Sequence, residues 1–373
     1  MNFVLHRRQL LLVAAGKALP AWSEALQPRT LVFPRDHGTH NDSQTEWWYL
    51  TGQAVGTDEQ LYGFQVTFFR SRVNDTQHLQ SRLAAKQLLF AHAAITDVNG
   101  QNLWHDQRIA RWNGEQPINA TERSSPGATF ALESDTGVAL RDWSLRRLTD
   151  GRYSARVKAA DFQIDLEAVP SQAILLQGEQ GFSRKGPDAT QSSFYVSQPQ
   201  LQVSGRMRIQ GRAINLQQGR AWLDHEWSEA LLHPDAVGWD WIGMNLDNGD
   251  SLTAFRLRRA DGTALWAGGS WRAAEQGNEP LGAQIFDHDV VHFEPLRVWT
   301  SPSTRARYPV AWRITTPAGE FTVRAQLDNQ ELDSRQSTGT VYWEGLSDLL
   351  NAQGQRIGRG YLEMTGYAQR LVL

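Results

Sequence analysis

Acidic and histidine residues stand directly beside tryptophans at three places in this sequence. The three segments are Thr45-Glu46-Trp47-Trp48-Tyr49-Leu50-Thr51-Gly52, Asp224-His225-Glu226-Trp227 and Gly238-Trp239-Asp240-Trp241. A protein core rarely places ionisable groups among aromatic rings, because a buried charge must be paired or neutralised. A pocket that binds a large apolar ligand and also moves a proton requires both kinds of residue. The pattern therefore predicts an aromatic-lined pocket for a hydrophobic small molecule or lipid.

The residues of these segments fall into two predicted roles. The candidate catalytic residues are Asp224, His225 and Glu46. The candidate ligand-binding residues are the aromatic ones, Trp47, Trp48, Tyr49, Trp227, Trp239 and Trp241.

The segment around His225 has the highest density of ionisable groups. On a strand, His225 and Trp227 point one way, while Asp224 and Glu226 point the other way together with Trp222. Histidine is the side chain best suited to proton transfer near neutral pH, and an aromatic face can stabilise a developing cation. The same residues could instead form a structural bridge between two domains, so both interpretations stay open.

Glu46 lies in an expected strand in which it shares one face with Trp48 and Leu50. It is either a carboxylate that lines the cavity with a raised pKa or a buried acid that is paired with an arginine or caps backbone amides. The spacing of the residues does not separate these two interpretations.

Two loops contain further candidate residues. Asp36, His37, His40 and Asp42 could supply metal ligands, but their spacing matches no zinc signature such as His-Glu-x-x-His, so we expect a polar loop, no metal and no cofactor. Ser183 and Lys185 could act as nucleophile and base. The Gly-x-Ser-x-Gly elbow is missing around them, and a solvated turn is expected.

The composition excludes several function classes. The chain has 373 residues and a net charge of -3, so it lacks the basic field that binds phosphates, and no nucleic-acid partner is expected. It contains no cysteine, which excludes a disulfide scaffold, a thiolate nucleophile and a cysteine-bound metal.

The N-terminal segment resembles a targeting sequence. His6-Arg7-Arg8 precedes a short apolar run, Gln9-Leu10-Leu11-Leu12-Val13-Ala14-Ala15, which is too short to span a membrane. Residues 1–25 are expected to be a signal peptide, with Arg7-Arg8 close to the twin-arginine pattern. The mature protein would then be exported to the periplasm or secreted. The alternative is a frayed N-terminus of a cytosolic protein.

The elements that position these residues are predicted to be strands. Apolar and polar residues alternate with period two in many short runs, such as Phe162-Gln163-Ile164-Asp165-Leu166-Glu167-Ala168, and turn signals such as Asn99-Gly100 separate the runs. The pattern predicts an all-β fold of antiparallel barrels or sandwiches. Two similar hairpins, 47–70 and 239–256, each end in Phe-Arg. They suggest two domains, 33–215 and 219–373.

Six segments in order resemble the AttH-like exported proteins, which are related to carotenoid 1,2-hydratase (hydroxyneurosporene synthase). They are residues 45–52, 182–186, 219–228, 238–241, 342–345 and 360–367. The resemblance implies two lipocalin-like antiparallel β-barrel domains. It also implies a secreted hydratase-like or hydrolase-like enzyme. The hydratase branch carries a Tyr-x-Asp on a following strand, but Thr253-Ala254-Phe255-Arg256 has neither residue, so carotene hydration is not expected.

A function of a different class also remains open. Small barrels can hold one hydrophobic ligand without any chemistry. The alternative is therefore a non-catalytic carrier or chaperone of the cell envelope that works with an ABC transporter. The sequence does not predict the oligomeric state.

Overall fold

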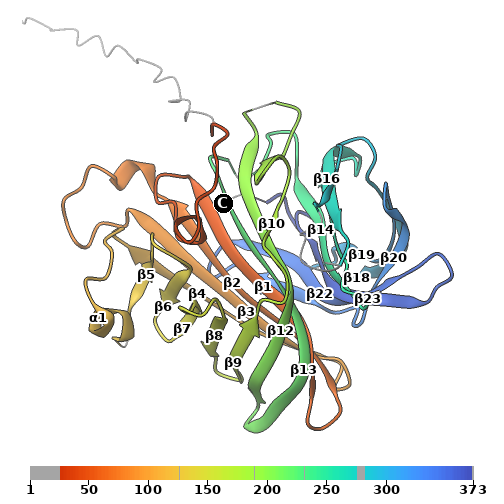
Figure 1. Ribbon diagram of the computed structural model, residues 1–373, viewed down its shortest axis with the longest axis horizontal. Coiled ribbons are helices and arrows are strands. Elements are labelled where there is room, and N and C mark those ends of the chain that lie inside the picture. Colours follow the sequence, from red (N-terminus) through yellow and green to blue (C-terminus); the bar gives the residue numbers. More distant parts are fainter. Residues whose placement is uncertain (1–25, 126, 189, 231, 275–281, 372–373) are drawn as a thin grey trace, which may run out of the picture.

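Two antiparallel β-sheets make up almost the whole molecule, which confirms the predicted all-β class (Figure 1). The computed structural model describes residues 26–125, 127–188, 190–230, 232–274 and 282–371. The expected signal peptide, 1–25, lies outside the described residues. The described helices are short: η1 (Arg35–His37), η2 (Asn74–Thr76) and α1 (Ala120–Ser124). Among the described residues no helix has the length and apolar character needed to cross a membrane.

The first sheet follows the order β4-β3-β2-β1-β13-β12-β9-β8-β7-β6-β5, with β10 and β11 added beside β12. Because β4 at one end of this order contacts β5 at the other, the sheet curls into a nearly closed barrel. Its strands are β1 (Thr45–Gly56), β2 (Leu61–Arg72), β3 (Gln87–Asp97), β4 (Asn102–Trp112), β5 (Thr129–Ala131), β6 (Gly137–Leu140), β7 (Trp143–Arg147), β8 (Tyr153–Lys158), β9 (Phe162–Val169), β10 (Leu175–Leu176), β11 (Phe182–Arg184), β12 (Ser192–Ile209) and β13 (Arg212–Ser228).

The second sheet follows the order β17-β16-β15-β14-β23-β22-β20-β19-β18, with β21 beside β22. As in the first sheet, the first long strand pairs with the last one, here β14 with β23. Its strands are β14 (Gly238–Leu246), β15 (Ser251–Arg258), β16 (Ala264–Arg272), β17 (Gln284–Phe286), β18 (His292–Thr300), β19 (Arg307–Thr316), β20 (Gly319–Ala325), β21 (Glu331–Ser334), β22 (Thr340–Leu350) and β23 (Arg356–Met364).

Apolar side chains fill the interior of each sheet. Along β9, Phe162, Ile164 and Leu166 are buried inside, while Gln163 and Glu167 face out, as period-two alternation requires. The interior of the first sheet is one continuous hydrophobic cluster, and a second cluster fills the other sheet. A third cluster joins the outer faces of the two sheets.

The expected domain boundary at 215–219 falls inside a strand. β13 pairs with β1 from Ser228 back to Leu216, so the first sheet ends at Ser228 and the second begins at Gly238. Gly219 does not belong to a linker: a Cβ there would lie 2.8 Å from the Cβ of Ala54 and 2.8 Å from the carbonyl oxygen of Gln53. The glycine allows two strands to approach closely.

The two similar segments seen in the sequence are matching hairpins. In β1–β2, Glu46 lies directly opposite Arg70, and in β14–β15, Asp240 lies directly opposite Arg256. Both acids are fully buried. Each hairpin thus holds one buried acid–arginine pair on its inner face, and its outer face is turned toward the other sheet.

Candidate functional site

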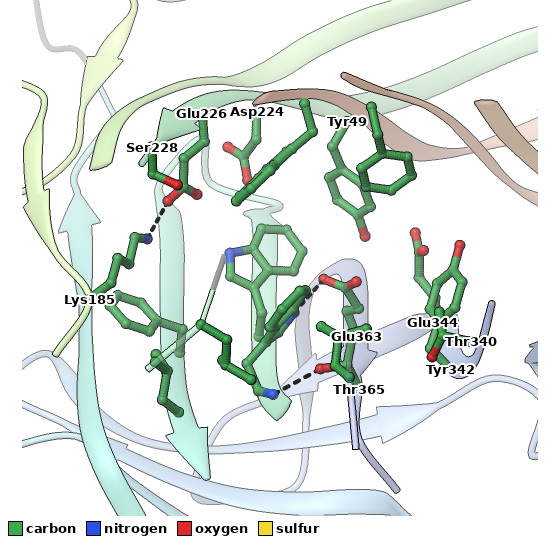
Figure 2. Close-up of a pocket in the computed structure, with 18 of the residues that line it drawn as sticks. Tyr49, Lys185, Asp224, Glu226, Ser228, Thr340, Tyr342, Glu344, Glu363 and Thr365 are labelled. Carbon is green, nitrogen blue, oxygen red and sulfur yellow. Dashed lines mark hydrogen bonds and ion pairs between the residues drawn. The ribbon is translucent and has the colours of Figure 1, made fainter. Parts of the chain in front are cut away.

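A pocket lies between the outer faces of the two sheets. β1 and β13 form one wall, and β14, β15, β22 and β23 form the other (Figure 2). Its cavity volume is about 120 Å³, close to the ~150 Å³ of an apolar cavity that holds a benzene molecule. The aromatic residues that line it are Trp47, Tyr49, Phe69, Tyr195, Trp239, Trp241, Phe255 and Tyr342.

Strand pairing brings acids and rings together on the pocket face. Asp224 lies directly opposite Tyr49, and Glu226 lies directly opposite Trp47. On the other wall, Glu363 has Trp241 across one neighbouring strand and Glu344 across the other. Such directly opposed residues are in side-chain contact range. The pocket therefore holds four carboxyl groups among aromatic walls.

Asp224 is a buried acid with three hydrogen-bond donors. Its Oδ1 accepts bonds from Ser197 Oγ at 2.5 Å and from Trp222 Nε1 at 2.6 Å, and its Oδ2 accepts one from Tyr195 Oη at 2.7 Å. Trp241 Nε1 in turn donates to Tyr195 Oη at 3.0 Å. Burial raises the pKa of Asp224 to about 7, although the three donors pull it down. The carboxyl group therefore exchanges a proton near neutral pH.

The carboxyl groups of the second sheet are also shifted toward the protonated form. Burial raises the pKa of Glu363 to about 7, against a hydrogen bond of 2.9 Å from Trp239 Nε1. Burial and the neighbouring Glu363 raise the pKa of Glu344 well above its usual value. Gln65 Nε2, from the first sheet, donates to Glu344 Oε2 at 2.6 Å. Both walls of the pocket therefore carry acids that are at least partly protonated at neutral pH.

Glu226 differs from these acids because it has a cationic partner. Lys185 Nζ lies 3.0 Å from Glu226 Oε1 at the edge of the pocket (Figure 2). Lys185 directly follows β11 and is 22% exposed, so the expected solvated turn instead brings its ammonium group to the pocket. Ser183, its expected partner, does not line this pocket.

The arrangement suits acid catalysis on an apolar molecule. A protonated carboxyl group in an apolar site can donate its proton, as in enzymes that keep such an acid neutral at pH 7. The donors around Asp224 stabilise the carboxylate that remains after the transfer. The faces of the surrounding aromatic rings stabilise positive charge on the substrate.

A second polar cluster is buried behind the first wall. Glu46 Oε2 accepts hydrogen bonds from Arg70 Nε at 2.8 Å and from Thr39 Oγ1 at 2.6 Å. Glu46 Oε1 lies 2.9 Å from both His225 Nε2 and His40 Nδ1. Burial would raise the pKa of Glu46, but Arg70 and the two histidines lower it well below its usual value. Glu46 is therefore a permanently ionised centre of a structural network.

His225 belongs to this network. Burial lowers its pKa even though Glu46 is adjacent, so the ring is neutral at pH 7 and its Nε2–H donates to Glu46. Trp48 stacks on the ring at 4.8 Å, and Trp227 stacks on His40 at 3.7 Å.

Among the described residues, His40, Glu46 and His225 also form a group whose ligand atoms lie within 4.8 Å of one another, close enough to hold a metal ion. The chemistry of the donors disfavours a metal here. Glu46 is already neutralised by Arg70, and a cation would have to displace that arginine or leave its charge buried and unpaired.

The predicted site residues are thus divided between the pocket, which both sheets line, and the inner face of the first sheet. Asp224, Trp47, Tyr49, Trp239 and Trp241 line the pocket. Glu46, His225, Trp48 and Trp227 face the inner side, where Glu46 matches the arginine-paired alternative.

The pocket residues that sequence reasoning missed are mainly the other acids, Glu226, Glu344 and Glu363. The signal that singled out Glu46 was present at Tyr342-Trp343-Glu344-Gly345 and Tyr361-Leu362-Glu363-Met364. In both segments an acid stands among aromatic and apolar residues of a strand.

Comparisons with known proteins agree on one family and one fold. A model of the AttH-like family matches residues 24–367. A solved structure of an AttH candidate from Nitrosomonas europaea is 43% identical, with a TM-score of 0.80 over 92% of this chain and 99% of that one. Kievitone hydratase from Nectria haematococca is 13% identical, with a TM-score of 0.67 over 92% and 94%. CghA is 11% identical, with a TM-score of 0.51 over 92% and 95%. No curated protein matches the sequence.

Proposed function

The chain belongs to the AttH-like family, and from that premise we propose that it is an exported hydratase-like enzyme. In this proposal it adds water to a carbon–carbon double bond of a mostly apolar ligand, bound between the two sheets. The observation that carries the proposal is the set of buried carboxyl groups with raised pKa values in an aromatic pocket, above all Asp224 at about 7. A site that only carried an apolar ligand would gain nothing from them, because buried polar groups weaken apolar binding.

The proposed reaction begins at Asp224. Its carboxyl proton moves to one carbon of the double bond, and the other carbon becomes a cation. The faces of Trp239 and Trp241 stabilise this cation, and Ser197, Trp222 and Tyr195 hold the carboxylate that is formed. Water then attacks the cation.

Glu363 on the opposite wall accepts the proton that the attacking water loses. With a pKa of about 7, a large fraction of Glu363 is ionised at neutral pH and can act as this base. Return of that proton to Asp224 closes the cycle. The net change is one alkene and one water converted to one alcohol.

The size of the cavity restricts the substrate. About 120 Å³ admits a branched alkenyl group or one ring and does not admit a whole carotenoid. The segment Thr253-Ala254-Phe255-Arg256 also lacks the Tyr-x-Asp that the resemblance to the carotenoid hydratase branch leads us to expect on this strand. Kievitone hydratase, named for hydration, shares the fold at 13% identity and supports the proposal at the level of architecture.

The test is turnover of branched alkenes in ¹⁸O-labelled water, followed by mass spectrometry. We expect ¹⁸O-alcohol from the wild type. Asp224→Asn should reduce its formation ~10²–10⁴-fold, the usual contribution of a general acid, and Glu363→Gln should also reduce it. The exposed Asp161→Asn is the matched control and should not change turnover. Alkenes recovered unchanged, although they bind with a saturable signal, would favour the carrier function.

A further inference from the structure

A second cavity lies beside the pocket. Its volume is about 380 Å³, and it shares Tyr195 and Phe255 with the pocket of about 120 Å³. We call these the outer cavity and the inner pocket. The outer cavity is also lined by Gln177, Ser183 and Trp266. Two aromatic side chains therefore separate two spaces that differ about threefold in volume.

Lys185 sits at this junction. Its Nζ lies 4.3 Å from the ring centre of Tyr195 and 4.4 Å from that of Phe255, the two rings that both cavities share. Among the described residues that line the inner pocket, it is the one lysine or arginine. Figure 2 shows the side chain reaching in from the edge toward Glu226.

Among the described residues, the Lys185 ammonium group has one ionic partner and two aromatic rings around it. A lysine ammonium carries three N–H groups, and the structure shows Glu226 as its ionic partner at 3.0 Å. Since Glu226 balances the charge and Asp224 and Glu363 lie in the same pocket, an incoming carboxylate would add a further negative charge. A neutral carbonyl or hydroxyl oxygen accepts the hydrogen bond without that repulsion.

The outer cavity offers flat surfaces and polar groups together. The ring of His288 stacks on Trp266 at 4.3 Å with an interplanar angle of 5°, and the guanidinium of Arg184 lies 4.6 Å from the centre of the Trp266 ring. These surfaces suit an oxygenated or cyclic part of a ligand better than an alkyl chain.

We propose that the substrate is an amphipathic molecule that spans both cavities. Its branched alkenyl end occupies the inner pocket, a neutral oxygen accepts a hydrogen bond from Lys185 at the junction, and the remainder lies in the outer cavity. The inference rests on the proposed function for the identity of the alkenyl end. It goes further by naming the substrate class and the residue that sets its position.

The first experiment measures binding by quenching of tryptophan fluorescence. The probes share one branched alkenyl chain and differ at its end, as a hydrocarbon, a methyl ketone, an alcohol and a carboxylate. The ketone and the alcohol should bind the wild type about 10-fold to 100-fold more tightly than the hydrocarbon, the range for a hydrogen bond to a charged group. Lys185→Met should remove this advantage. Lys158→Met removes an exposed cation that lines neither cavity, and the advantage should persist.

Equal affinity of the wild type for ketone and hydrocarbon would overturn the proposal, and this comparison needs no variant. Tightest binding of the carboxylate would also overturn it, since the oxygen at Lys185 would then be anionic. If Lys185→Met lowers the affinity for all four probes equally, Lys185 has only a packing role and the proposal is overturned.

A second experiment tests whether the ligand spans both cavities. Ile285 lines the outer cavity and is 42% exposed, so Ile285→Trp narrows that cavity at a tolerant position. The variant should bind a ketone with a bulky ring beyond the carbonyl at least 10-fold more weakly than the wild type does. Its affinity for the methyl ketone should be unchanged. Equal effects on both ketones, or no effect on either, would refute the spanning mode.

Both experiments measure ligand binding and do not measure turnover. The oxygen preference can therefore hold even if no alkene is hydrated, and hydration can be found even if the oxygen preference is missing.

Discussion

The raised pKa of Asp224 predicts how the free energy of unfolding depends on pH. A carboxyl group whose pKa is higher in the folded than in the unfolded protein binds its proton more tightly in the folded state. Folding is then favoured at low pH, and this contribution is lost as the pH rises through the window between the two values. For Asp224 the window runs from the ordinary value of 3.8 to about 7. At ~1.36 kcal/mol per pKa unit, the loss is about 4 kcal/mol.

Asp224→Asn removes this titration. The amide keeps a carbonyl oxygen that can accept from Ser197 and Trp222, and the hydroxyl of Tyr195 can rotate to accept from the new amide nitrogen. We expect most of this loss, about 3 kcal/mol, to occur between pH 4 and pH 7 in the wild type and to be missing from the variant. The variant would gain relative stability above pH 7 while losing turnover.

The measurement is urea unfolding of both proteins at several pH values, followed by tryptophan fluorescence. Glu363 and Glu344 titrate in the same direction in both proteins, and the charge of Asp224 contributes to the raised pKa of Glu363, so the difference reports Asp224 together with its coupling to Glu363. The exposed Asp161→Asn is the control and should follow the wild-type curve. Parallel curves for the wild type and Asp224→Asn would refute the argument, because they would show that the aspartate ionises alike in both states.

The remaining predictions concern the residues behind the pocket and the leader. Glu46→Gln should cost about 3–5 kcal/mol in urea unfolding because it leaves a buried arginine charge unpaired, and Asp240→Asn should do the same in the other sheet; unchanged stability with lost turnover would make Glu46 catalytic. His225→Ala should lower stability by about 1–3 kcal/mol and change turnover little, whereas a large loss of turnover at unchanged stability would restore its catalytic role. Residues 1–25 should be missing from the protein isolated from its native cell, and changing Arg7 and Arg8 to lysine should strongly reduce export, as cell fractionation can check.

The sequence was sufficient for the fold class and for the faces of single strands. Alternation correctly placed Asp224 and Glu226 on one side of β13 and His225 and Trp227 on the other. It could not show which side faces the pocket. That depends on the second sheet, and Glu363 reaches Trp241 through pairing between strands more than 100 residues apart in sequence.

The choice between the two readings of Glu46 also depended on strand pairing. An arginine 24 residues away neutralises it because β1 and β2 form a hairpin in that register. The sequence shows Phe-Arg at the end of both hairpins. That each arginine pairs with the acid in the first strand of its hairpin becomes known only from the register of the two strands. A local segment therefore reveals that an acid is buried, and the paired strand reveals why.

Glu46 and Asp224 differ in protonation, and the residues on the neighbouring strands contribute to the difference. Glu46 faces Arg70 and is held ionised, whereas Asp224 faces Tyr49 and Ser197 and retains its proton to about pH 7. A shift of the β1–β13 register by one residue would exchange the two faces of a strand. It would bring Asp224 into the filled interior and His225 into the pocket.

The long ladder between β1 and β13, from Thr45 opposite Ser228 to Ala54 opposite Gly219, opposes such a shift. The close approach of the strands at Gly219 also opposes this shift, because only a glycine fits against Ala54 there. Near Asp224 the chemistry is thus fixed by backbone pairing that begins far from the pocket. Mutations at Gly219 should consequently disturb proton transfer through the register, although the residue touches no ligand.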